Sequence, residues 1–316
     1  MRTPIILDVD TGIDDALALM LAARHPDLDL RAVTCVSGNT TLANVVANTC
    51  AVLDLAGAED VAVAAGAQRP LIEPARDAAY VHGADGLGNL GLPASGRSVD
   101  RRHAVELLRQ VLTEAEQPVT LVALAPMTNL ALLLRMYPEV ATRIDRVVFM
   151  GGSASIGNAS PVAEFNVWHD PEAAAIVTGS GLELTMYGLD VFHQVVVDAG
   201  EVARLADSAA PMVQAVGRLL GYQGESEEPP LRLIGDAGAV CALLAPELMR
   251  IERWPVRVEL TGLSRGQTIV DRRTRAGEDR VHGTPRAWPE LDVVLDVDAP
   301  AVVDLFLQAL GCRPHP

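Results

Sequence analysis

The sequence of 316 residues is poor in aromatic side chains, in cysteine and in positive charge. Phe, Trp and Tyr together make up only 3% of the residues, whereas apolar residues as a whole make up 49%. A core built mainly from Ala, Val and Leu is typical of a sheet covered by helices, and it argues against a disordered chain. At this length the chain is able to bury a large core, as one big α/β domain or two smaller ones.

Basic residues are outnumbered, because 25 Lys and Arg stand against 41 Asp and Glu and give a net charge of −16 at pH 7. Since phosphate binding requires a basic surface, this balance disfavours nucleic acid as a partner. No run of 18 uncharged apolar residues occurs, so we expect no membrane span. The four cysteines show no CxxC spacing, which favours reduced, buried thiols. The chain enters a strand-like run at once, so we expect no signal peptide and a cytoplasmic location.

Short apolar runs alternate with longer helical stretches along the chain. Runs such as "PIILDV", "VTLVAL" and "RVVFM" indicate buried strands, and stretches such as "DDALALMLAARH" and "MTNLALLLRMYP" indicate helices. This alternation predicts an open, mainly parallel α/β sheet flanked by helices, in which ligands bind beyond the carboxyl ends of the strands. We see no linker and no repeat, so we expect residues 1–316 to form a single domain. Irregular loops near 67–100 and 221–230 are possible rims or lids over a site.

Four aspartates fall within eight residues where the first strand becomes a helix, in "DVDTGIDD". Carboxylates at a helix N-terminus gain only a few tenths to about 1 kcal/mol each, which explains one or two of them. Asp10 follows the strand, and Asp14 and Asp15 lie in the first helical turn. Three carboxylates there favour a hard, oxygen-liganded cation such as Ca²⁺ or Mg²⁺ over a solvated Asp-rich turn. A dinucleotide site is excluded because no GxGxxG follows this strand.

A second polar loop, "GNASPVAEFNVWHDPEAA", follows the predicted strand "RVVFM". Asn158, Glu164 and Asn166 are the side-chain types that pair with sugar hydroxyls, so the loop resembles a hydroxyl-binding surface. The alternative is a loop stabilised by its own Asx turns. Asp170 followed by Pro171 predicts an ordinary helix cap with a structural role only.

Other predicted strand ends also carry polar residues. "VSGN" contains Asn39, "YVHGADGLGN" contains His82, and "LVALAPMTN" contains Leu124 and Asn129. Asp236, in "LIGDAG", precedes an apolar helix and fits a plain N-cap as well as a ligand.

These residues resemble the nucleoside hydrolases, the inosine-uridine-preferring nucleoside N-ribohydrolases. "DVDTGIDDALAL" is similar to that family's signature and "GNASPVAEFNVWHDPEAA" to its second motif. "APMTNLA", "RGQTIVDRR" and "DVVLDVDAPAVVDLFLQAL" also fit, so the resemblance covers essentially the whole chain. It implies a Rossmann-like sheet and Ca²⁺-dependent hydrolysis of the N-glycosidic bond of ribonucleosides to ribose and free base. It further implies a role in purine or pyrimidine nucleoside catabolism and a homodimer or homotetramer.

The resemblance also implies a role for each site residue. Ca²⁺ would be bound by Asp10, Asp15, Asp236 and the backbone carbonyl of Leu124, with Asp10 also acting as general base. The implied substrate contacts are Asp14 to the ribose 2′-OH, Asn39 to the water and sugar, Asn158 and Glu164 to the 5′-OH, Asn166 and Asp236 to the 3′-OH, and His82 to the nucleobase. Asp8 receives no role.

One position departs from the family's pattern. Many members have a His immediately before the last metal-binding Asp, and that His protonates the departing base, whereas this chain has Gly235. Tyr222 and His82 are the alternative proton donors, and the preference for purine or pyrimidine stays open. The missing acid also leaves open a non-catalytic or altered-substrate nucleoside- or ribose-binding member. An Asp-dependent phosphohydrolase is disfavoured, because no Lys or Arg interrupts the Asp and Asn motifs.

Overall fold

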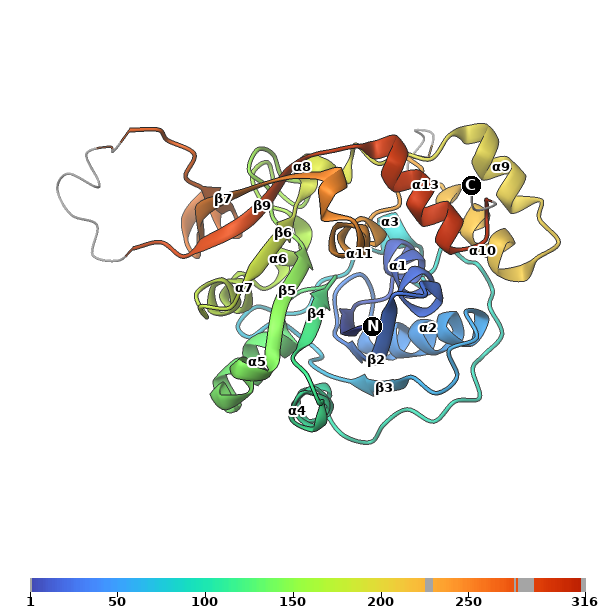
Figure 1. Ribbon diagram of the computed structural model, residues 1–316, viewed down its shortest axis with the longest axis horizontal. Helices are drawn as coiled ribbons and strands as arrows, with labels where there is room; N and C mark the ends of the chain where they lie inside the picture. The colour runs from blue at the N-terminus through green and yellow to red at the C-terminus, as the bar shows by residue number, and fades with distance from the viewer. Residues whose placement is uncertain (1, 225–229, 276, 278–286, 314–316) are drawn as a thin grey trace.

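The computed structural model describes residues 2–224, 230–275, 277 and 287–313. Within these residues, nine strands form one sheet in the order β3-β2-β1-β4-β5-β6-β9-β7-β8 (Figure 1). The strands are β1 (Thr3–Val9), β2 (Leu28–Cys35), β3 (Ala62–Ala65), β4 (Val119–Ala123), β5 (Ile144–Met150), β6 (Leu184–Tyr187), β7 (Met249–Val258), β8 (Thr268–Val270) and β9 (Glu290–Val297).

Helices connect most of these strands. They are α1 (Ile13–Arg24), α2 (Leu42–Leu55), α3 (Ala79–His82), α4 (Ala104–Glu114), α5 (Thr128–Met136), α6 (Phe165–His169), α7 (Pro171–Thr178), α8 (Leu189–Phe192), α9 (Ala199–Ala206), α10 (Pro211–Leu220), α11 (Ala237–Leu244) and α13 (Ala299–Ala309). Short 3₁₀ turns span Pro138–Arg143, Pro246–Leu248 and Gly262–Ser264. Among the described helices, none has both the length and the apolar composition that crossing a membrane requires.

The predicted open, mainly parallel sheet is confirmed. Strands β1 to β6 and β9 pair in parallel, whereas β7 runs antiparallel to both β9 and β8. The chain builds outward from β1 through β2 to β3, then returns to β4 on the other side of β1 and continues through β5 to β6. The order therefore reverses between β1 and β4, which is where open α/β sheets bind their ligands.

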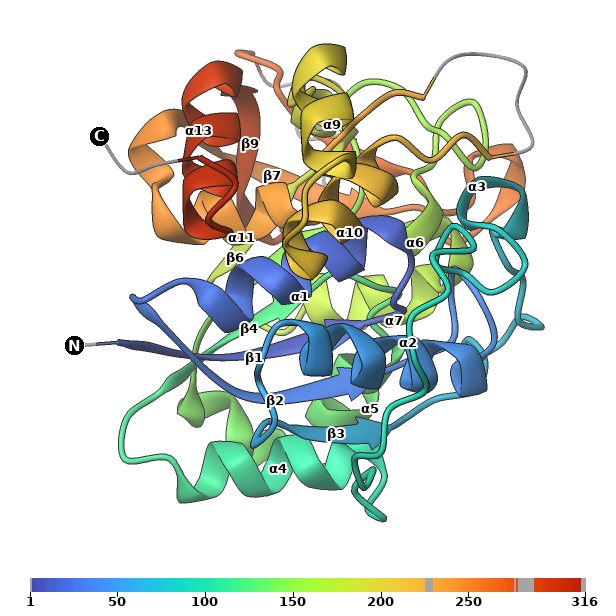
Figure 2. The same cartoon turned by 90° about the vertical axis from the view of Figure 1, so that its right-hand side faces the viewer.

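Two apolar layers cover the sheet. Helices α1, α2, α10, α11 and α13 pack on one face, and α4, α5 and α7 pack on the other (Figures 1 and 2). Strand β1 is buried on both faces, because Leu7 joins the first layer and Ile6 joins the second. Burying one such side chain contributes roughly 1.5–3 kcal/mol, so the two layers hold the central strand ends rigidly. Asp8 lies on the same face as Ile6, which directs its side chain towards α5.

The two irregular loops meet at this end of the sheet. The segment 67–100 contains α3, and residues 221–224 lie beside it, since Gly224 approaches the backbone of Tyr80 and Val81. Residues 225–229 of the loop near 221–230 lie outside the described residues. The described parts of both loops line the cavity considered next.

Candidate active site

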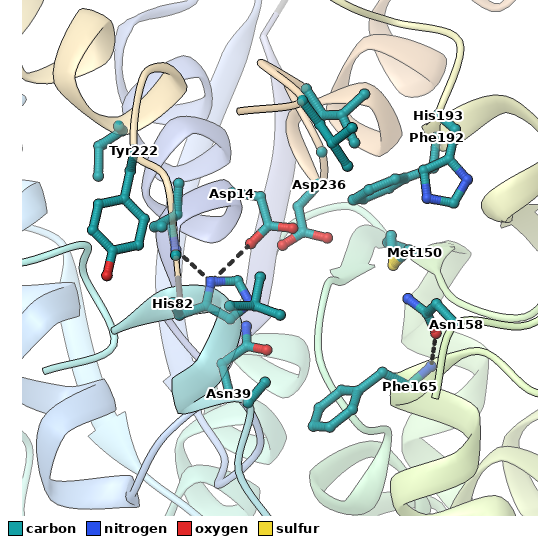
Figure 3. Close-up of a pocket in the computed structure, with 18 of the residues that line it drawn as sticks. Asp14, Asn39, His82, Met150, Asn158, Phe165, Phe192, His193, Tyr222 and Asp236 are labelled. Carbon is teal, nitrogen blue, oxygen red and sulfur yellow. Dashed lines mark hydrogen bonds and ion pairs between the residues drawn. The ribbon is translucent and has the colours of Figure 1, made fainter. Parts of the chain in front are cut away.

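A cavity of about 670 Å³ opens beyond the carboxyl ends of β1, β4 and β5 (Figure 3). Of the residues expected at the site, those that line it are Asp14, Asn39, His82, Leu124, Asn158, Glu164, Asn166 and Asp236. Asp10 and Asp15 do not line it, but both are fully buried and hydrogen bonded to Asn39, which does. The fold therefore brings every expected site residue to one place, from segments more than 200 positions apart.

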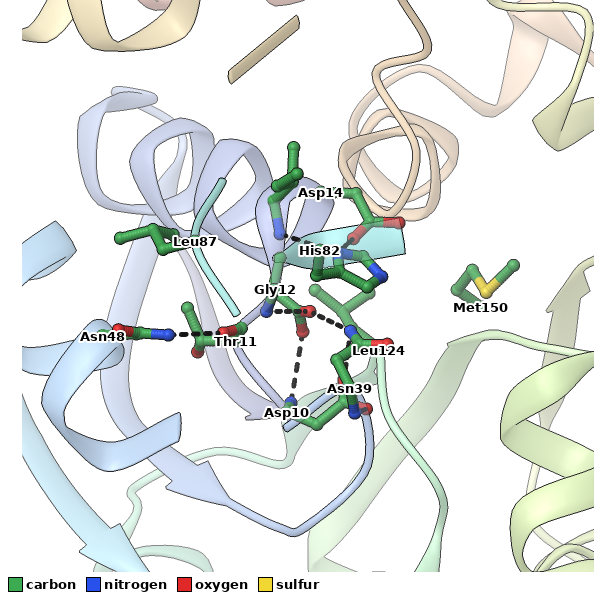
Figure 4. A network of polar contacts seen from close by, with 12 residues as sticks. Asp10, Thr11, Gly12, Asp14, Asn39, Asn48, His82, Leu87, Leu124 and Met150 are labelled. Atoms are coloured by element: carbon green, nitrogen blue, oxygen red, sulfur yellow. Dashed lines mark hydrogen bonds and ion pairs between the residues drawn. The ribbon is translucent and has the colours of Figure 1, made fainter. Parts of the chain in front are cut away.

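Asn39 joins Asp10, which lies beside it in Figure 4, to Asp15. The Asp15 carboxylate accepts the backbone N–H groups of Asp10 (3.2 Å) and Gly12 (2.9 Å), which closes the turn before α1. Asn39 donates its backbone N–H to Asp10 Oδ2 (2.7 Å), and its side-chain amide reaches Asp10 Oδ1 (3.2 Å) and Asp15 Oδ2 (3.1 Å). One amide thus holds two carboxylates side by side.

The carboxylates at this point are short of positive charge. Asp14, Asp15 and Asp236 each offer an oxygen within 4.8 Å of the others, whereas Asp10 lies outside this closest grouping. Burial and the Asp14 charge raise the pKa of Asp15 to about 7. Burial likewise raises the pKa values of Asp10 and Asp236 well above their usual range, and the neighbouring carboxylates add to the effect. Among the described residues, Asp14 Oδ1 is shielded from solvent yet has no hydrogen-bond partner. A cluster of this kind fits a hard divalent cation, which would remove the mutual repulsion.

Asp236 is at the N-cap position of α11, but in the described structure its side chain makes no capping hydrogen bond. Its carboxylate instead faces Asp14 across the cavity floor (Figure 3). The plain-cap interpretation is therefore wrong, and the side chain is available to a ligand. The Leu124 carbonyl, at the end of β4, accepts the side-chain amide of Asn166 (2.9 Å), which also bonds the carbonyl of Met150 (3.2 Å).

The loop before α6 is held by its own side chains and still lines the cavity. Glu164 caps α6, because its carboxylate accepts the backbone N–H groups of Asn166 (2.8 Å), Val167 (3.1 Å) and Gly152 (2.9 Å). Asn158 Oδ1 accepts the N–H of Phe165 (2.9 Å). Burial raises the pKa of Glu164 to about 7 despite these donors. The loop is therefore stabilised by its own side chains, and the binding of sugar hydroxyls by this loop stays a prediction.

His82 and Tyr222 lie at one end of the cavity, away from Asn158 and Phe165 (Figure 3). The Nδ1 atom of His82 accepts the backbone N–H of Ile13 (3.1 Å), so in the neutral ring the proton is on Nε2. Burial lowers the pKa of His82 and favours this neutral form, although Asp14 lies 3.9 Å from Nδ1. His82 therefore presents an N–H donor rather than a cation to the cavity.

Gly235 has a backbone φ of +57°, a conformation that L side chains rarely adopt. A Cβ atom at this position would lie 2.3 Å from Cβ of Asp14. The first turn of α1 therefore occupies the space that a side chain at position 235 would need. This backbone therefore requires a glycine at position 235.

Other cavity residues were not identified from the sequence. They include Phe165 at the start of α6, Phe192 at the end of α8, and His193 and Arg232 in the segments that follow α8 and precede α11. Phe165 lies inside a quoted motif and could have been found there. The others belong to segments without recognisable spacing, so only the path of the chain places them here.

Comparison with known proteins gives a consistent result. A family model described as "inosine-uridine preferring nucleoside hydrolase" matches residues 5–304. A pyrimidine-specific ribonucleoside hydrolase, RihA, from Salmonella paratyphi B is 39% identical over 317 residues, covering 98% of this chain and 99% of the relative. RihA from an Enterobacter species is 40% identical, covering 98% of each chain.

Solved structures agree with this finding. The plant nucleoside hydrolase PpNRh1 superposes with a TM-score of 0.89 at 31% identity, over 98% of this chain and 99% of its own. A purine-preferring ribonucleoside hydrolase from Gardnerella vaginalis gives a TM-score of 0.86 at 27% identity, with the same coverage.

Proposed function

Because the chain belongs to the inosine-uridine preferring nucleoside hydrolase family, we propose that it hydrolyses pyrimidine ribonucleosides with the help of a bound Ca²⁺. The family assigns the reaction, which is cleavage of an N-glycosidic bond. The proposed preference for pyrimidine follows the pyrimidine-specific relatives at 39–40% identity, which are more similar to this chain than the purine-preferring structure at 27%. The observation that carries the proposal is the buried carboxylate cluster on the cavity floor.

The proposed cation ligands are Asp10, Asp15, Asp236 and the carbonyl of Leu124. Their chemistry fits Ca²⁺, because every ligand is a hard oxygen and the raised carboxyl pKa values point to a missing positive charge. When bound, the ion supplies a Lewis acid that lowers the pKa of water and orients hydroxyl groups. Asp14, the proposed 2′-OH ligand, belongs to the same close grouping as Asp15 and Asp236, so a ribose bound there would lie next to the proposed cation.

Asp10 is the proposed general base. Two hydrogen bonds from Asn39 fix the orientation of its carboxylate, so that it accepts a proton from the attacking water without first rotating. The Asn39 amide also bonds Asp15, so it holds the proposed base Asp10 and the proposed cation ligand Asp15 in a fixed arrangement.

The remaining residues are proposed to hold the ribose. Asp14 would bind the 2′-OH, Asn166 and Asp236 the 3′-OH, and Asn158 and Glu164 the 5′-OH. Cleavage of a ribosidic bond passes through an oxocarbenium-like state, in which positive charge grows on the sugar ring. The carboxylates around the cavity would stabilise that positive charge as it develops. They would therefore stabilise the transition state more than the bound substrate.

His82 is the proposed contact to the departing base. Its Nε2–H is available to the leaving group, because the Ile13 amide occupies Nδ1. A neutral imidazole donates a hydrogen bond and keeps its proton. Leaving-group activation should therefore be weaker here than in relatives with a histidine at position 235. Tyr222 is the alternative donor from the same end of the cavity.

A nucleoside panel tests the proposed function. The purified protein is incubated with uridine, cytidine, inosine and adenosine, with Ca²⁺ or with a chelator, and released reducing sugar is measured. We expect uridine and cytidine to be cleaved faster than inosine, and chelation to abolish turnover. Nucleoside binding without release of ribose would favour the non-catalytic alternative. Release of phosphate from p-nitrophenyl phosphate would point to a phosphohydrolase.

We further propose that residues 1–316 act as one domain, with loops 67–100 and 221–230 as rims of the cavity. A homodimer or homotetramer stays a prediction from the resemblance, and a cytoplasmic location stays a prediction from the start of the sequence. Light scattering of the purified protein and fractionation of the source cells would check them.

A further inference from the structure

Two neighbouring residues at the start of α5 each hold a buried aspartate. Thr128 Oγ1 donates a hydrogen bond to Asp170 Oδ2 (2.7 Å), and Asn129 Nδ2 donates one to Asp8 Oδ1 (2.8 Å). All four residues are at most 2% exposed, and none of them lines the cavity. They therefore lie behind the site and have no direct route to the substrate.

The hydrogen bonds of Asn129 and Asp8 connect the strands that carry the proposed cation ligands. Asp8 Oδ1 also accepts the hydroxyl of Thr34 on β2 (2.6 Å), and Asn129 donates to the carbonyl of Cys35 (3.1 Å). The backbone carbonyl of Asp8 accepts the N–H of Leu124 (2.8 Å). These hydrogen bonds connect the ends of β1, β2 and β4. Asp10, the loop that carries Asn39, and the Leu124 carbonyl lie within one or two residues of these contacts.

The hydrogen bonds of Thr128 and Asp170 connect α5 to the segment that carries the proposed ribose ligands. Asp170 directly follows α6, and its backbone N–H bonds the carbonyl of Asn166. Its carboxylate accepts the N–H groups of Ala173 at the start of α7 (3.0 Å) and of Leu71 (2.9 Å). Asp170 is therefore a helix cap as expected, but it also ties α6 to α5.

A single loop, residues 66–71, contacts both Asn129 and Asp170. Asn129 Oδ1 accepts the N–H of Ala67, and the Ala67 carbonyl accepts the N–H of Ser37 in the loop that carries Asn39. Four residues later the same loop reaches Asp170 through Leu71. The packing is tight, because a Cβ on Gly66 would lie 2.2 Å from Asn129 Oδ1.

We propose that Thr128 and Asn129 are positioning residues that set the cation-binding and ribose-binding halves of the site relative to each other. Asn129 acts through Asp8 on the cation half, and Thr128 acts through Asp170 on the ribose half. The inference rests on the proposed function for its assignment of the two halves. It also gives Asp8 a role, as the carboxylate through which Asn129 holds β1.

The test separates the two halves by two binding measurements. Calorimetry gives the affinity of each purified variant for Ca²⁺, and then for ribose in saturating Ca²⁺. Outer-shell partners of metal ligands typically contribute about 10- to 100-fold to metal affinity. Because the Asn129 and Asp8 side chains are one contact further from the proposed ligands, we expect Asn129→Ala and Asp8→Ala to lower Ca²⁺ affinity by about tenfold, at the lower end of that range. Thr128→Val should leave Ca²⁺ affinity within about twofold and should lower ribose affinity, and Thr128→Ser should restore it.

Two controls keep the result interpretable. Leu112→Ala opens a gap in the buried face of α4 away from both halves, so it reports general destabilisation. Asp8→Asn keeps an acceptor oxygen for Thr34 and Asn129, so it should bind Ca²⁺ far better than Asp8→Ala. The inference is overturned if Leu112→Ala changes both affinities as much as Asn129→Ala, or if Asn129→Ala and Thr128→Val change both affinities alike. Because neither readout requires turnover, a parent protein that cleaves no nucleoside would refute the proposed function and leave this test intact.

Discussion

At the level of single residues, the side chain of Asp14 occupies the space that a side chain at position 235 would need. The backbone at position 235 is left-handed, and Asp14 lies where its side chain would go. A histidine at position 235, which the family resemblance led us to expect, is therefore incompatible with this backbone unless α1 or the loop moves.

We expect Gly235→His to lower both stability and activity instead of restoring an acid. A non-glycine residue at this φ costs on the order of 1–3 kcal/mol before the contact with Asp14 is counted. Thermal unfolding and kcat/KM for uridine measure the two effects. Gly235→Ala should change both in the same direction, because its Cβ alone meets Asp14. A Gly235→His variant that is as stable as the parent and faster on inosine would contradict this prediction.

His82 is expected to matter only when the leaving group needs help. A hydrogen bond to a group that develops charge contributes about 1.5–3 kcal/mol, which is roughly a 10- to 100-fold effect on rate. His82→Ala should therefore slow uridine cleavage by that factor and change cleavage of a p-nitrophenyl riboside little, since nitrophenolate leaves unaided. Steady-state kcat/KM for both substrates checks this, with Tyr222→Phe as the matched variant. If Tyr222→Phe is the variant that selectively slows uridine, the donor is Tyr222.

At the level of elements, the short helix α6 shows why a loop can serve structure and function together. Its five residues are too few to be stable alone, so Glu164 caps one end and Asp170 follows the other. The same cap leaves Asn166 and Phe165 facing the cavity. Losing the Glu164 cap would therefore disturb the loop before α6 and would also remove the proposed contact of Glu164 to the 5′-OH.

The contact between α9 and the segment after α13 depends on an acidic side chain. Hydrogen bonds from Arg204 and then Arg313 lower the pKa of Glu201 to about 2, against 4.5 for an unperturbed glutamate. The ionised form is favoured in the folded state, so its contribution is present above about pH 4.5 and is lost as the pH falls towards 2.

Glu201→Gln should therefore lower Tm at pH 7, and the difference from the parent should shrink as the pH approaches 3. Thermal unfolding of both proteins across this range measures the effect. Glu247→Gln, at an exposed position, is the control and should show no such convergence. A Tm difference that stays constant from pH 7 to pH 3 would contradict the prediction.

At the level of the whole molecule, the carboxylate cluster couples cation binding to folding. The acidic oxygens come from the turn after β1, the first turn of α1 and the start of α11, so only the folded chain assembles them. A ligand that binds only the folded state at 100 times its Kd stabilises it by about 2.7 kcal/mol.

We expect about one Ca²⁺ per chain, and a Tm that rises by several degrees when Ca²⁺ is added to chelator-treated protein. Metal analysis and thermal unfolding measure the two quantities. Asp10→Ala and Asp236→Asn should show reduced occupancy and a smaller rise, whereas Glu59→Gln, at an exposed position away from the cavity, should behave like the parent. Full calcium occupancy in Asp10→Ala would rule out the proposed site.

The sequence by itself determined the sheet class and the edge of the sheet at which the candidate site lies. Alternating apolar strands and helices are local patterns, and the residue that follows a parallel strand necessarily lies at the ligand-binding edge. Asp10, Asn39 and Leu124 could be assigned there because each directly follows or closely follows a strand. The family resemblance, carried by short contiguous motifs, was available from the same local information.

Only the tertiary structure decided how distant residues act on one another. Asp8 and Asn129 are 121 positions apart, and their contact depends on how β1 and α5 pack across one face of the sheet. The proton position on His82 depends on the Ile13 amide, and the need for glycine at position 235 depends on Asp14. No local pattern encodes these contacts, because they arise where loops of irregular length bring separate elements together.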